Sequence, residues 1–336
     1  MTIKDISRET GYSVGTISRV LNNHPNVSEK ARRAVTEVIA RSGFQRNENA
    51  KNLKQQKKEG LLALVKGRKN ELFASVIEHL QLCFATTSYT LLVDYFDETQ
   101  DEVLRAVHLC AEKKPQGLLF LGGNCKNFRS AFSEIRIPAV LITDNASELL
   151  FENLSSVYTN DVAAADCAVS YLLQQGHHAL GIIGGDPAIS DTSRMRLVGC
   201  RNAMRRNGLT EADTVREIAL FSYQGGYEAM QRILAAPKPV TAVFAMSDVM
   251  AIGAIRALHD CGLRVPEDIS VCGFDGLHIG RFFLPKLTTV RQSAEQLAER
   301  SARILLDSIE HHTPAKHEIV PFTLDAYESV APNAAR

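Results

Sequence analysis

The sequence predicts an all-α helix-turn-helix head followed by an α/β core made of two doubly wound parallel-sheet lobes. Three observations lead to this prediction. Residues 1–43 carry apolar side chains at helical spacing, and residues 44–60 are almost wholly polar, as in a linker. Beyond residue 60, short apolar runs alternate with amphipathic stretches in two successive series. Such alternation is typical of βα units on a parallel sheet.

The first two helices of the head are predicted from apolar spacing and from the residues that separate them. Ile3 and Ile6 are spaced to share one helix face, and Gly11 can end that helix in a left-handed turn. Ser13 is a suitable N-cap, because its hydroxyl can accept a hydrogen bond from the backbone N–H of Thr16. The apolar face of the second helix is Ile17, Val20 and Leu21.

A third helix is expected from the cap Ser28 to Ser42, because its apolar residues repeat at helical spacing and would close a small core with the first two. Two short helices joined by a turn that contains glycine form the helix-turn-helix plan. The apolar residues of the third helix are Ala31, Val35, Val38 and Ile39.

The core is predicted from two series of apolar runs, each run separated from the next by a helical stretch. The first series is Leu61–Val65, Tyr89–Val93, Gly117–Leu121 and Ala139–Ile142, and the second is Leu180–Ile183, Thr241–Ala245 and Ile269–Gly273. The expected helices are Leu72–Thr86, Glu102–Lys113, Ala163–Gln175, Arg196–Asn207, Gly226–Ala235, Val249–Cys261 and Ala294–Glu310.

Charge is distributed unevenly along a chain whose net charge is zero. Residues 1–60 contain 12 Lys and Arg against 6 Asp and Glu, which leaves 26 against 32 in the rest of the chain. A basic head on an acidic body indicates a nucleic-acid-binding arm, although scatter among solvated faces can also produce such a difference.

Length and composition point to an ordinary globular protein of two or three domains. The chain has 336 residues, of which 45% are hydrophobic and 23% are charged. Its seven cysteines are dispersed without Cys-x-x-Cys pairs, as reduced cytoplasmic thiols are. The N-terminus lacks an apolar signal core, and no run is long enough to cross a bilayer. We therefore expect a cytoplasmic protein without a membrane partner.

No motif indicates an enzyme, a metal site or a cofactor. Residues 11–15 fit the hydrolase pattern G-x-S-x-G, but that motif requires a strand before the serine, and a helix is expected there. The histidine pairs at 177–178 and 311–312 lack the spacing and the carboxylates of a metal site. The glycines at 122–123 and 184–185 lack a full dinucleotide fingerprint.

The head resembles that of the lactose/galactose repressor (LacI/GalR) family of bacterial regulators. The resemblance lies in TIKDIS, GYSVGTISRVLNN and VSEKARRAV, with Ser7, Thr10 and Tyr12 as departures. It implies that the helix from Val14 to Asn22 enters the major groove of an operator. Val14, Gly15 and Arg19 would then occupy the base-reading positions, and Arg19 can donate two hydrogen bonds to guanine. Thr16, Ser18 and Asn22 would contact phosphates.

The linker, residues 46–60, resembles the hinge helix of the same family through Asn47-x-x-Ala50-x-x-Leu53. The resemblance implies that Leu53 wedges between base steps in the minor groove. Lys51 and Lys54, with Lys57 and Lys58, would meet phosphates, whereas a plain basic linker is the alternative. Arg46 stands where the family usually has proline. Paired hinge helices imply a homodimer on a near-palindromic site.

The predicted core, residues 61–336, resembles the family's periplasmic-binding-protein-like core over nearly all of Leu61 to about Ser329. The matching blocks are QQGHHALGIIGG, RLVGCRNAMRRNG, TAVFAMSDVMAIGAIRALHDCGLRVPEDISVCGFD and PKLTTVRQ. After the helix-turn-helix domain at residues 1–45 and the hinge, this core would bind an effector and dimerise. Lobe 1 would hold about 61–160 and 293–317, and lobe 2 about 161–290 and 318–332. A ligand would lie between the lobes at the carboxyl ends of the strands.

Six residues of this core are candidates for effector binding by the resemblance. Arg196, three residues before Gly199, is at the clamping position, and Asp275 can accept from two sugar hydroxyls. Phe73 and Phe221 match aromatic residues that line the cleft or stack on the ligand. Ser247 stands where asparagine is frequent, and the usual aspartate after the strand 139–142 is replaced by Thr143, with Asp144 following. A buried ion pair or a core aromatic is the alternative interpretation of these positions.

The sequence thus predicts a DNA-binding transcription regulator, a repressor by family default, with double-stranded operator DNA and a small carbohydrate effector as partners. The alternative is a transport-type solute-binding protein without a regulatory role. The basic head and the absence of a signal peptide argue against that alternative. An enzyme is not expected.

Overall fold

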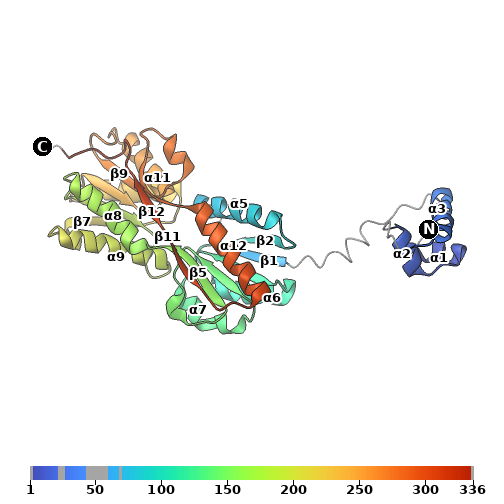
Figure 1. Cartoon of the computed structure of the whole chain (residues 1–336). Helices are drawn as coiled ribbons and strands as arrows, with labels where there is room; N and C mark the ends of the chain where they lie inside the picture. The colour runs from blue at the N-terminus through green and yellow to red at the C-terminus, as the bar shows by residue number, and fades with distance from the viewer. Residues whose placement is uncertain (1–2, 22–26, 43–59, 68–69, 334–336) are drawn as a thin grey trace. The chain divides into compact units, whose positions relative to one another are not determined.

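The computed structural model describes residues 3–21, 27–42, 60–67 and 70–333. The chain forms two compact units, Met1–Lys57 and Lys58–Arg336. The first unit contains helices α1 (Ile3–Thr10), α2 (Val14–Leu21) and α3 (Glu29–Ser42). The second unit is the two-lobed core (Figure 1). Of the expected hinge, 46–60, only Gly60 lies within the described residues.

Local signals in the head act as the sequence predicts. Gly11 follows α1 with φ of +70°, a left-handed conformation that glycine adopts without a steric penalty. The backbone N–H of Thr16 donates to the Ser13 hydroxyl at 3.2 Å, which caps α2. Ser28 caps α3 in the same way, with the N–H of Ala31 at 3.3 Å. The three predicted helices and their caps are therefore confirmed.

A small apolar core holds the three helices of the head together. Ile6, Ile17, Val20 and Val35 are buried in it, one or two from each helix. The departures from the family pattern satisfy their polar groups locally, since the Ser7 hydroxyl donates to the carbonyl of Tyr12 and that of Thr10 to the carbonyl of Ile6, each at 2.7 Å. Half-buried residues that pack against this core are Tyr12, Leu21, Val27, Val38 and Ile39.

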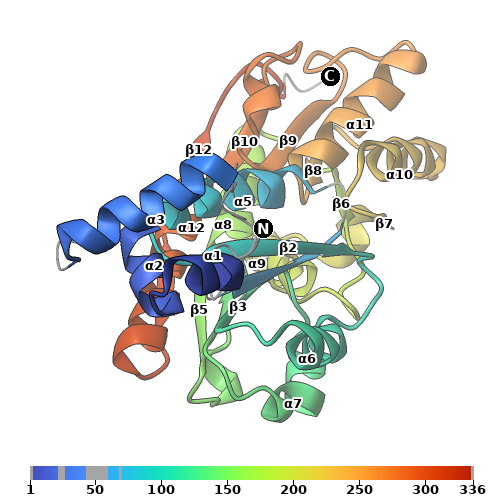
Figure 2. The same ribbon diagram turned by 90° about the vertical axis from the view of Figure 1, so that its right-hand side faces the viewer.

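Lobe 1 is built on a six-stranded parallel sheet in the order β11-β5-β4-β3-β1-β2. Helices α5 and α12 cover one face, and α6 and α7 cover the other (Figures 1 and 2). Alternate residues of β1 serve the two faces, which is why that strand is apolar throughout. The strands are β1 (Gly60–Lys66), β2 (Thr90–Phe96), β3 (Gly117–Leu121), β4 (Ala139–Ile142), β5 (Leu154–Thr159) and β11 (His317–Val320). The helices are α5 (Glu71–Ala85), α6 (Glu102–Lys113), α7 (Cys125–Ala131), α12 (Ala294–His311), η1 (Phe132–Glu134) and η2 (Ser147–Leu149).

Lobe 2 repeats this plan with the order β12-β10-β9-β8-β6-β7, in which β12 alone runs antiparallel to its neighbour. Helices α8 and α9 pack on one face and α10 and α11 on the other. The strands are β6 (Leu180–Gly184), β7 (Thr214–Ile218), β8 (Ala242–Ala245), β9 (Ser270–Asp275), β10 (Thr288–Gln292) and β12 (Phe322–Asp325). The helices are α8 (Asp161–Gln174), α9 (Asp191–Arg206), α10 (Tyr223–Ala235), α11 (Asp248–Asp260), η3 (Glu211–Asp213) and η4 (His278–Arg281). Two doubly wound lobes after a helical head are the predicted fold class, which is confirmed.

The chain passes between the lobes three times: after β5, after β10 and between β11 and β12. The return to lobe 2 comes later than the expected position near Glu318. Glu318 pairs with Val157 of β5 in lobe 1, and the chain enters the second sheet only at Phe322. The apolar pattern does not mark this crossing, because β11 is a half-exposed edge strand.

Candidate functional site

A cleft lies between the two lobes, where the carboxyl ends of their strands meet. Its cavity volume is about 580 Å³, within the range of small-molecule pockets. Loops after β1, β2, β3 and β4 line it from lobe 1, and loops after β6, β7 and β9 line it from lobe 2. The parallel strand order of each lobe therefore explains why residues far apart in sequence converge here. Five of the six candidate residues line this cleft: Phe73, Asp144, Arg196, Phe221 and Asp275.

Arg196 lies at the centre of a buried charge cluster on α9. Its side chain is 5% exposed, and its Nε donates to Asp161 Oδ1 at 2.7 Å. Its Nη1 donates to the carbonyl of Met246 and lies 3.9 Å from Asp275 Oδ1. The guanidinium also stacks on the ring of Phe274, 3.7 Å from its centroid. These contacts hold the guanidinium in one orientation at the cleft.

Asp275 ends β9 with an unusual backbone and a buried carboxylate. Its φ of 113° lies outside the regions that side-chain-bearing residues favour. Gln292 Nε2 donates to its Oδ1 at 2.9 Å. Burial raises the pKa of Asp275 to about 7, although the neighbouring Arg196 opposes the rise. This carboxyl group can therefore both accept and, when protonated, donate a hydrogen bond in the neutral pH range.

Thr143 and Asp144 directly follow β4 at the opposite wall of the cleft. Asp144 Oδ2 accepts from the N–H of Gly123 at 3.1 Å. Burial raises the pKa of Asp144 well above its usual value, and the nearby Asp161 and Asp191 raise it further. Thr143 has φ of 81°, and its buried Oγ1 has no hydrogen-bond partner among the described residues. A strained β-branched residue with an unsatisfied hydroxyl is typical of a ligand-binding position.

The two aromatic candidates lie at opposite sides of the cleft. Phe73 is buried in the first turn of α5, where its N–H donates to the cap residue Asn70 at 3.2 Å. Phe221 is half-buried just before α10, beside Gly185. A Cβ added at Gly185 would lie only 2.6 Å from the Phe221 ring and from the Ser193 hydroxyl, so both side chains would have to shift to make room for it.

Ser247 differs from the sequence-based expectation. It is 2% exposed and is not among the residues that line the cleft. Its hydroxyl accepts from the N–H of Met250 at 3.3 Å and caps α11. A serine that precedes a helix is a favourable N-cap, and that local role accounts for it. The adjacent carbonyl of Met246, not the Ser247 side chain, reaches Arg196.

Several polar residues of the cleft were not predicted. Each lies at or just after the carboxyl end of a strand, or at the start of a helix that faces the cleft, a positional signal that the strand order supplies. Lys66 ends β1 and forms an ion pair with the buried Glu102, Nζ to Oε2 at 2.7 Å. Burial raises the pKa of Glu98, and the adjacent Asp97 adds to the rise. The unpredicted polar lining residues are Lys66, Asn70, Asp97, Glu98, Asp186, Ser190, Thr192 and Ser222.

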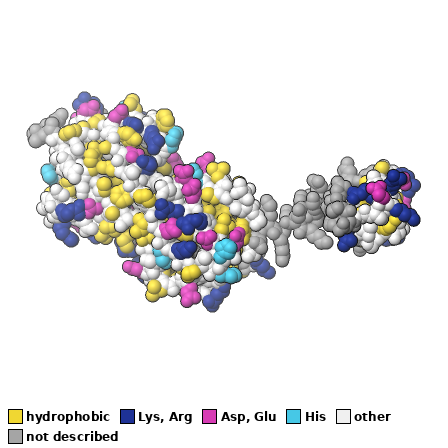
Figure 3. Space-filling view, viewed as in Figure 1, with side chains coloured by type: hydrophobic (Ala, Val, Ile, Leu, Met, Phe, Trp, Pro, Cys, Tyr) yellow, Lys and Arg dark blue, Asp and Glu magenta, His cyan; other side chains and the backbone are white. Residues whose placement is uncertain are grey.

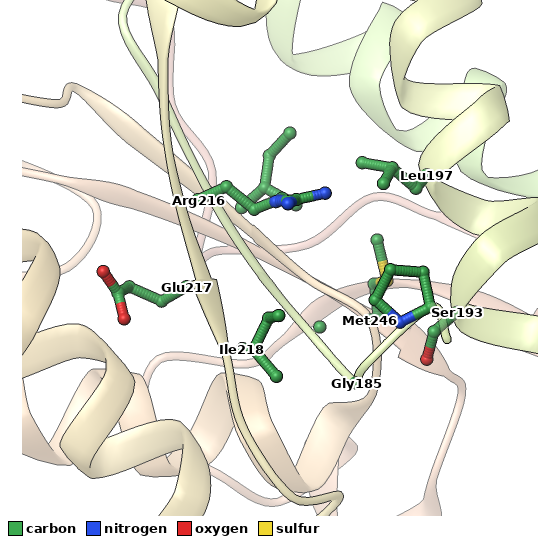
Figure 4. Close-up of a pocket in the computed structure, with 10 residues that line it drawn as sticks. Gly185, Ser193, Leu197, Arg216, Glu217, Ile218 and Met246 are labelled. Atoms are coloured by element: carbon green, nitrogen blue, oxygen red, sulfur yellow. The ribbon is translucent and has the colours of Figure 1, made fainter. Parts of the chain in front are cut away.

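A second, much smaller cavity lies beside the wall of the cleft in lobe 2, with Gly185 and Ile218 lining both spaces. Figure 4 shows Gly185 between Ile218 on one side and Ser193 and Met246 on the other. Its volume of about 10 Å³ is near the minimum for one water molecule. The buried Ser193 hydroxyl has no partner among the described residues, so a water molecule there would have a polar contact.

Hydrogen bonds connect the lobes at the edges of the cleft. Cys125 N donates to Asp191 Oδ2 at 2.6 Å, and Asn124 Nδ2 donates to the carbonyl of Ile189 at 3.2 Å. On the other side, the Tyr223 hydroxyl donates to Glu71. These bonds join α7 to the start of α9 and α10 to α5. Apolar contacts add to these bonds, since Val249 and Leu277 of lobe 2 pack in the hydrophobic core of lobe 1.

In the head, the candidate base-reading residues lie on the solvent-exposed face of α2. Val14 is 41% exposed, and Gly15 and Arg19 are exposed as well. Thr16 and Ser18 are half-buried, and the hydroxyls of Ser13 and Thr16 lie 3.0 Å apart. Figure 3 shows that Lys and Arg side chains gather over this unit. Asn22, Lys51, Leu53 and Lys54 lie outside the described residues.

Among the residues that the structure describes, no group of three or more His, Cys, Asp or Glu side chains could hold a metal ion. No helix in the described part of the chain is both long and apolar enough to span a bilayer.

Comparison with known proteins links the head and the core to one family. Residues 2–47 match the model for bacterial regulatory proteins of the lacI family, and residues 169–330 match a periplasmic binding protein-like domain. The HTH-type transcriptional regulator MalR of Clostridium butyricum is 34% identical over 324 residues, which cover 95% of this chain and 96% of MalR. The chain belongs to the LacI family.

Other members have similar length and architecture. The transcriptional repressor CytR of Escherichia coli K12 is 31% identical over 92% of this chain and 90% of its own length. Among solved structures, a lac repressor dimer bound to operator and the anti-inducer ONPF is 22% identical with a TM-score of 0.78. The CelR–cellobiose complex is 25% identical with a TM-score of 0.68. Each of these structures covers 98% of this chain and is itself covered to 99%. The protein is thus a LacI-family transcriptional regulator with an effector-binding domain.

Proposed function

We propose that this protein is a homodimeric repressor that binds an operator through its head. A sugar or sugar derivative bound in the cleft changes its affinity for that operator. The observation that carries the proposal is the cleft itself. It joins a clamped guanidinium, buried carboxylates and two aromatic side chains in one cavity between two lobes. Carboxylates and a fixed guanidinium recognise hydroxyl groups, and aromatic faces pack against sugar rings.

The relatives support the same assignment. A LacI-family regulator from Enterococcus faecium has been solved with bound ribose, and CelR with cellobiose. The lac repressor in complex with its operator is a dimer. For this chain, we assign base reading to Val14, Gly15 and Arg19, and phosphate contacts to Thr16, Ser18 and Asn22. We assign no enzymatic activity, and we place the protein in the cytoplasm.

The test uses the full chain and fragments of the promoters that neighbour its gene. We expect fluorescence anisotropy to show nanomolar, sequence-dependent binding to one fragment, and a change of at least tenfold in that affinity when a cognate sugar is added. Dimerisation is checked by analytical ultracentrifugation on the same sample. The proposal fails if all promoter fragments bind as weakly as random DNA at physiological salt, with or without sugars.

A further inference from the structure

The two lobes are joined differently on the two faces of the lobe 1 sheet. On the face covered by α5 and α12, Val249 and Leu277 of lobe 2 pack in the hydrophobic core of lobe 1. On the face covered by α6 and α7, the apolar core contains only lobe 1 residues among those that the structure describes. Hydrogen bonds between the start of α7 and the start of α9 join the lobes there. The lobes can therefore part on this second face with little loss of buried apolar surface.

This polar contact is formed by the turn between β3 and α7, residues 122–125, which we call the β3–α7 turn. Three successive backbone N–H groups of the turn donate to three different carboxylates. The pairs are Gly123 and Asp144 at 3.1 Å, Asn124 and Glu102 at 2.6 Å, and Cys125 and Asp191 at 2.6 Å. Two of these carboxylates belong to lobe 1, and the third belongs to α9 of lobe 2. The turn is thus bound by both lobes.

Asp191, the first residue of α9, uses one oxygen within its own helix and the other across the lobes. Its Oδ1 accepts from Arg194 Nη2 at 2.5 Å, and its Oδ2 accepts from the N–H of Cys125. Burial opposes ionisation of this carboxyl group, but the hydrogen bonds from Cys125 and Arg194 outweigh burial and lower the pKa of Asp191. The interlobe bond is therefore made to an ionised carboxylate, which makes it stronger than a bond between neutral groups.

Asn124 adds a second hydrogen bond between the lobes. Its Nδ2 donates to the carbonyl of Ile189 at 3.2 Å, just before α9. Its Oδ1 accepts from the N–H of Lys126 at 3.0 Å and caps α7. A shift of the Asn124 backbone would therefore change the start of α7 and the contact with lobe 2 together.

Glu102 connects the β3–α7 turn to the cleft from a fully buried position. Its Oε1 accepts from the N–H of Asn124, and its Oε2 accepts from Asn127 Nδ2 at 3.0 Å and Lys66 Nζ at 2.7 Å. Lys66 lines the cleft, whereas the Glu102 side chain is 0% exposed. Displacement of the Lys66 ammonium would leave a buried carboxylate uncompensated. Glu102 would then have to move, and Asn124 with it.

We propose that the β3–α7 turn is a latch that holds the two lobes closed, and that Glu102 is a positioning residue that couples this latch to the cleft through Lys66. A ligand that draws Lys66 away from Glu102 weakens the latch, and a ligand that leaves the pair intact preserves it. This last step rests on the proposed effector role of the cleft. Glu102 and Asp191 are not among the residues that line the cleft, so both act through other groups.

The test is amide hydrogen exchange, followed by mass spectrometry, on the full-length protein without ligand or DNA. Asp191→Ala alters lobe 2 and is read in residues 121–128 of lobe 1. We expect exchange there to rise about tenfold, because a hydrogen bond to a charged group is lost from the closed form. The rise should include the N–H groups of Gly123 and Asn124, which keep their own acceptors. Acceleration confined to the Cys125 amide, or none, would overturn the latch.

Glu102→Gln and Lys66→Met alter lobe 1 and are read in residues 184–192 of lobe 2. In that segment the N–H groups of Ile189 and Ser190 donate to the carbonyl of Asp186. We expect each substitution to raise exchange of these amides about tenfold, because the Asn124 contact is loosened. Unchanged exchange in lobe 2 for both variants would overturn the role of Glu102.

The double variant, Lys66→Met with Glu102→Gln, removes both charges and so avoids an unpaired buried carboxylate. It decides the question if a single variant fails to fold. We expect it to exchange in residues 184–192 as fast as Glu102→Gln does, because both changes break the same link. Wild-type exchange in the double variant, or the product of two independent effects, would overturn the coupling through Lys66.

Asp166→Ala is the matched control. Asp166 on α8 accepts from Arg206 Nη1 on α9 at 2.7 Å, so this pair lies within lobe 2, and its carboxylate is 20% exposed against 13% for Asp191. The control should leave both reporting segments as in wild type. The buried strand β8 should also keep its wild-type exchange in every variant. An equal rise in β8 would overturn the latch, because the variant would then be destabilised as a whole.

Operator binding by the same preparations separates this inference from the proposed function. If the wild-type protein recognises an operator but the substitutions leave exchange unchanged in the opposite lobe, the latch is wrong and the regulatory role stands. If exchange responds as expected but no DNA fragment is recognised, the latch stands and the regulatory role fails.

Discussion

Thr143 and Asp275 have strained backbone conformations, and both residues line the cleft. Both have positive φ, 81° and 113°, at the carboxyl end of a strand, and both line the cavity. Non-glycine residues adopt such angles at a cost, which surrounding structure must offset. The Gln292 amide and the nearby Arg196 hold the Asp275 carboxyl group in place. We infer that the strain orients these two side chains toward a ligand.

The pKa of Asp275 leads to a prediction about stability. Burial raises the pKa of Asp275 to about 7 in the folded protein, so the folded state binds this proton more tightly than the unfolded state does. The free energy of unfolding should therefore fall as pH rises from about 4 to 7, by up to about 1.4 kcal/mol per pH unit from this group, and level off above 7. Asp275→Asn removes this titration. Urea denaturation between pH 5.5 and 7.5 should give a shallower dependence of the unfolding free energy on pH for this variant than for wild type. Glu112→Gln, which removes an exposed carboxylate on α6, is the control and should keep the wild-type slope. Identical slopes for all three proteins would contradict the assignment.

Arg19 carries the prediction for the head. Arg19→Ala should weaken binding to the operator by about 1–3 kcal/mol and keep much of the weak, salt-sensitive binding to random DNA, because a bidentate contact to guanine discriminates between sequences and phosphate contacts do not. Fluorescence anisotropy on both DNAs at two salt concentrations measures the ratio. Arg8→Ala, an exposed position on α1, is the control and should keep the ratio of wild type. Equal losses on both DNAs would exclude base reading by Arg19.

Helix packing sets the position of the Arg196 side chain in the cleft. The α8–α9 pair packs closely at Gly199, one turn after Arg196 on α9. A Cβ at this position would lie 2.3 Å from the carbonyl oxygen of Val162 and 2.8 Å from the backbone N of Asp166. Backbone atoms of α8 cannot move aside as a side-chain end can. The glycine thus allows Arg196 to reach Asp161 at the start of α8.

Substitution of this glycine tests the packing. Gly199→Ala should lower the free energy of unfolding by about 1–3 kcal/mol through overpacking, and it should weaken ligand binding because Arg196 moves with α9. Urea denaturation followed by circular dichroism gives the first quantity. Gly60→Ala is the control, since no atom of the described residues lies within 4 Å of a Cβ at that position. A Gly199→Ala protein as stable as wild type would show that the two helices are not constrained at this point.

The whole molecule combines a DNA-binding head with a two-lobed core. The lobes are joined by three chain crossings and by hydrogen bonds from residues 124, 125 and 223 across the cleft. A ligand that contacts both lobes can therefore change how far they close, provided that it binds the open and closed forms unequally. Through the linker, residues 46–60, such a change would alter how two heads in a dimer engage DNA.

The linker supplies the prediction at this scale. Leu53→Ala should reduce the bend of operator DNA and weaken specific binding, because a methyl group cannot wedge between base steps as leucine does. Bend angles are measured by a circular-permutation assay. Leu53→Ile keeps an apolar wedge and should retain most of the bend. If Leu53→Ala leaves the bend angle unchanged, the hinge assignment is wrong, and residues 46–60 are a plain basic linker.

The sequence by itself determined the elements whose signals are local. Gly11, Ser13 and Ser28 mark the ends of the head helices, and the structure has the expected turn and caps there. Apolar runs identify β1, β2, β3, β4, β6, β8 and β9, and these strands were predicted. Five strands were missed. The strands β5 and β10 are buried inside their sheets, but Ser, Thr, Arg and Gln interrupt their apolar pattern. The strands β7, β11 and β12 are mostly half-buried or exposed and carry polar residues. Hydrogen bonds within one turn, and the apolar runs of strands that are buried on both faces, involve residues that are close in sequence. They can therefore be predicted from the sequence.

The resemblance to the family had named five residues of the cleft, but only the tertiary structure decided which partners they meet there. Arg196 pairs with Asp161, 35 residues away, and Lys66 with Glu102, 36 residues away, because strand order and helix packing bring them together. Ser247, an effector candidate by sequence, became a helix cap, and Asp97 and Glu98 came to line the cavity unpredicted. Contacts between distant residues depend on how sheets and helices are layered, and no periodicity along the chain contains that information.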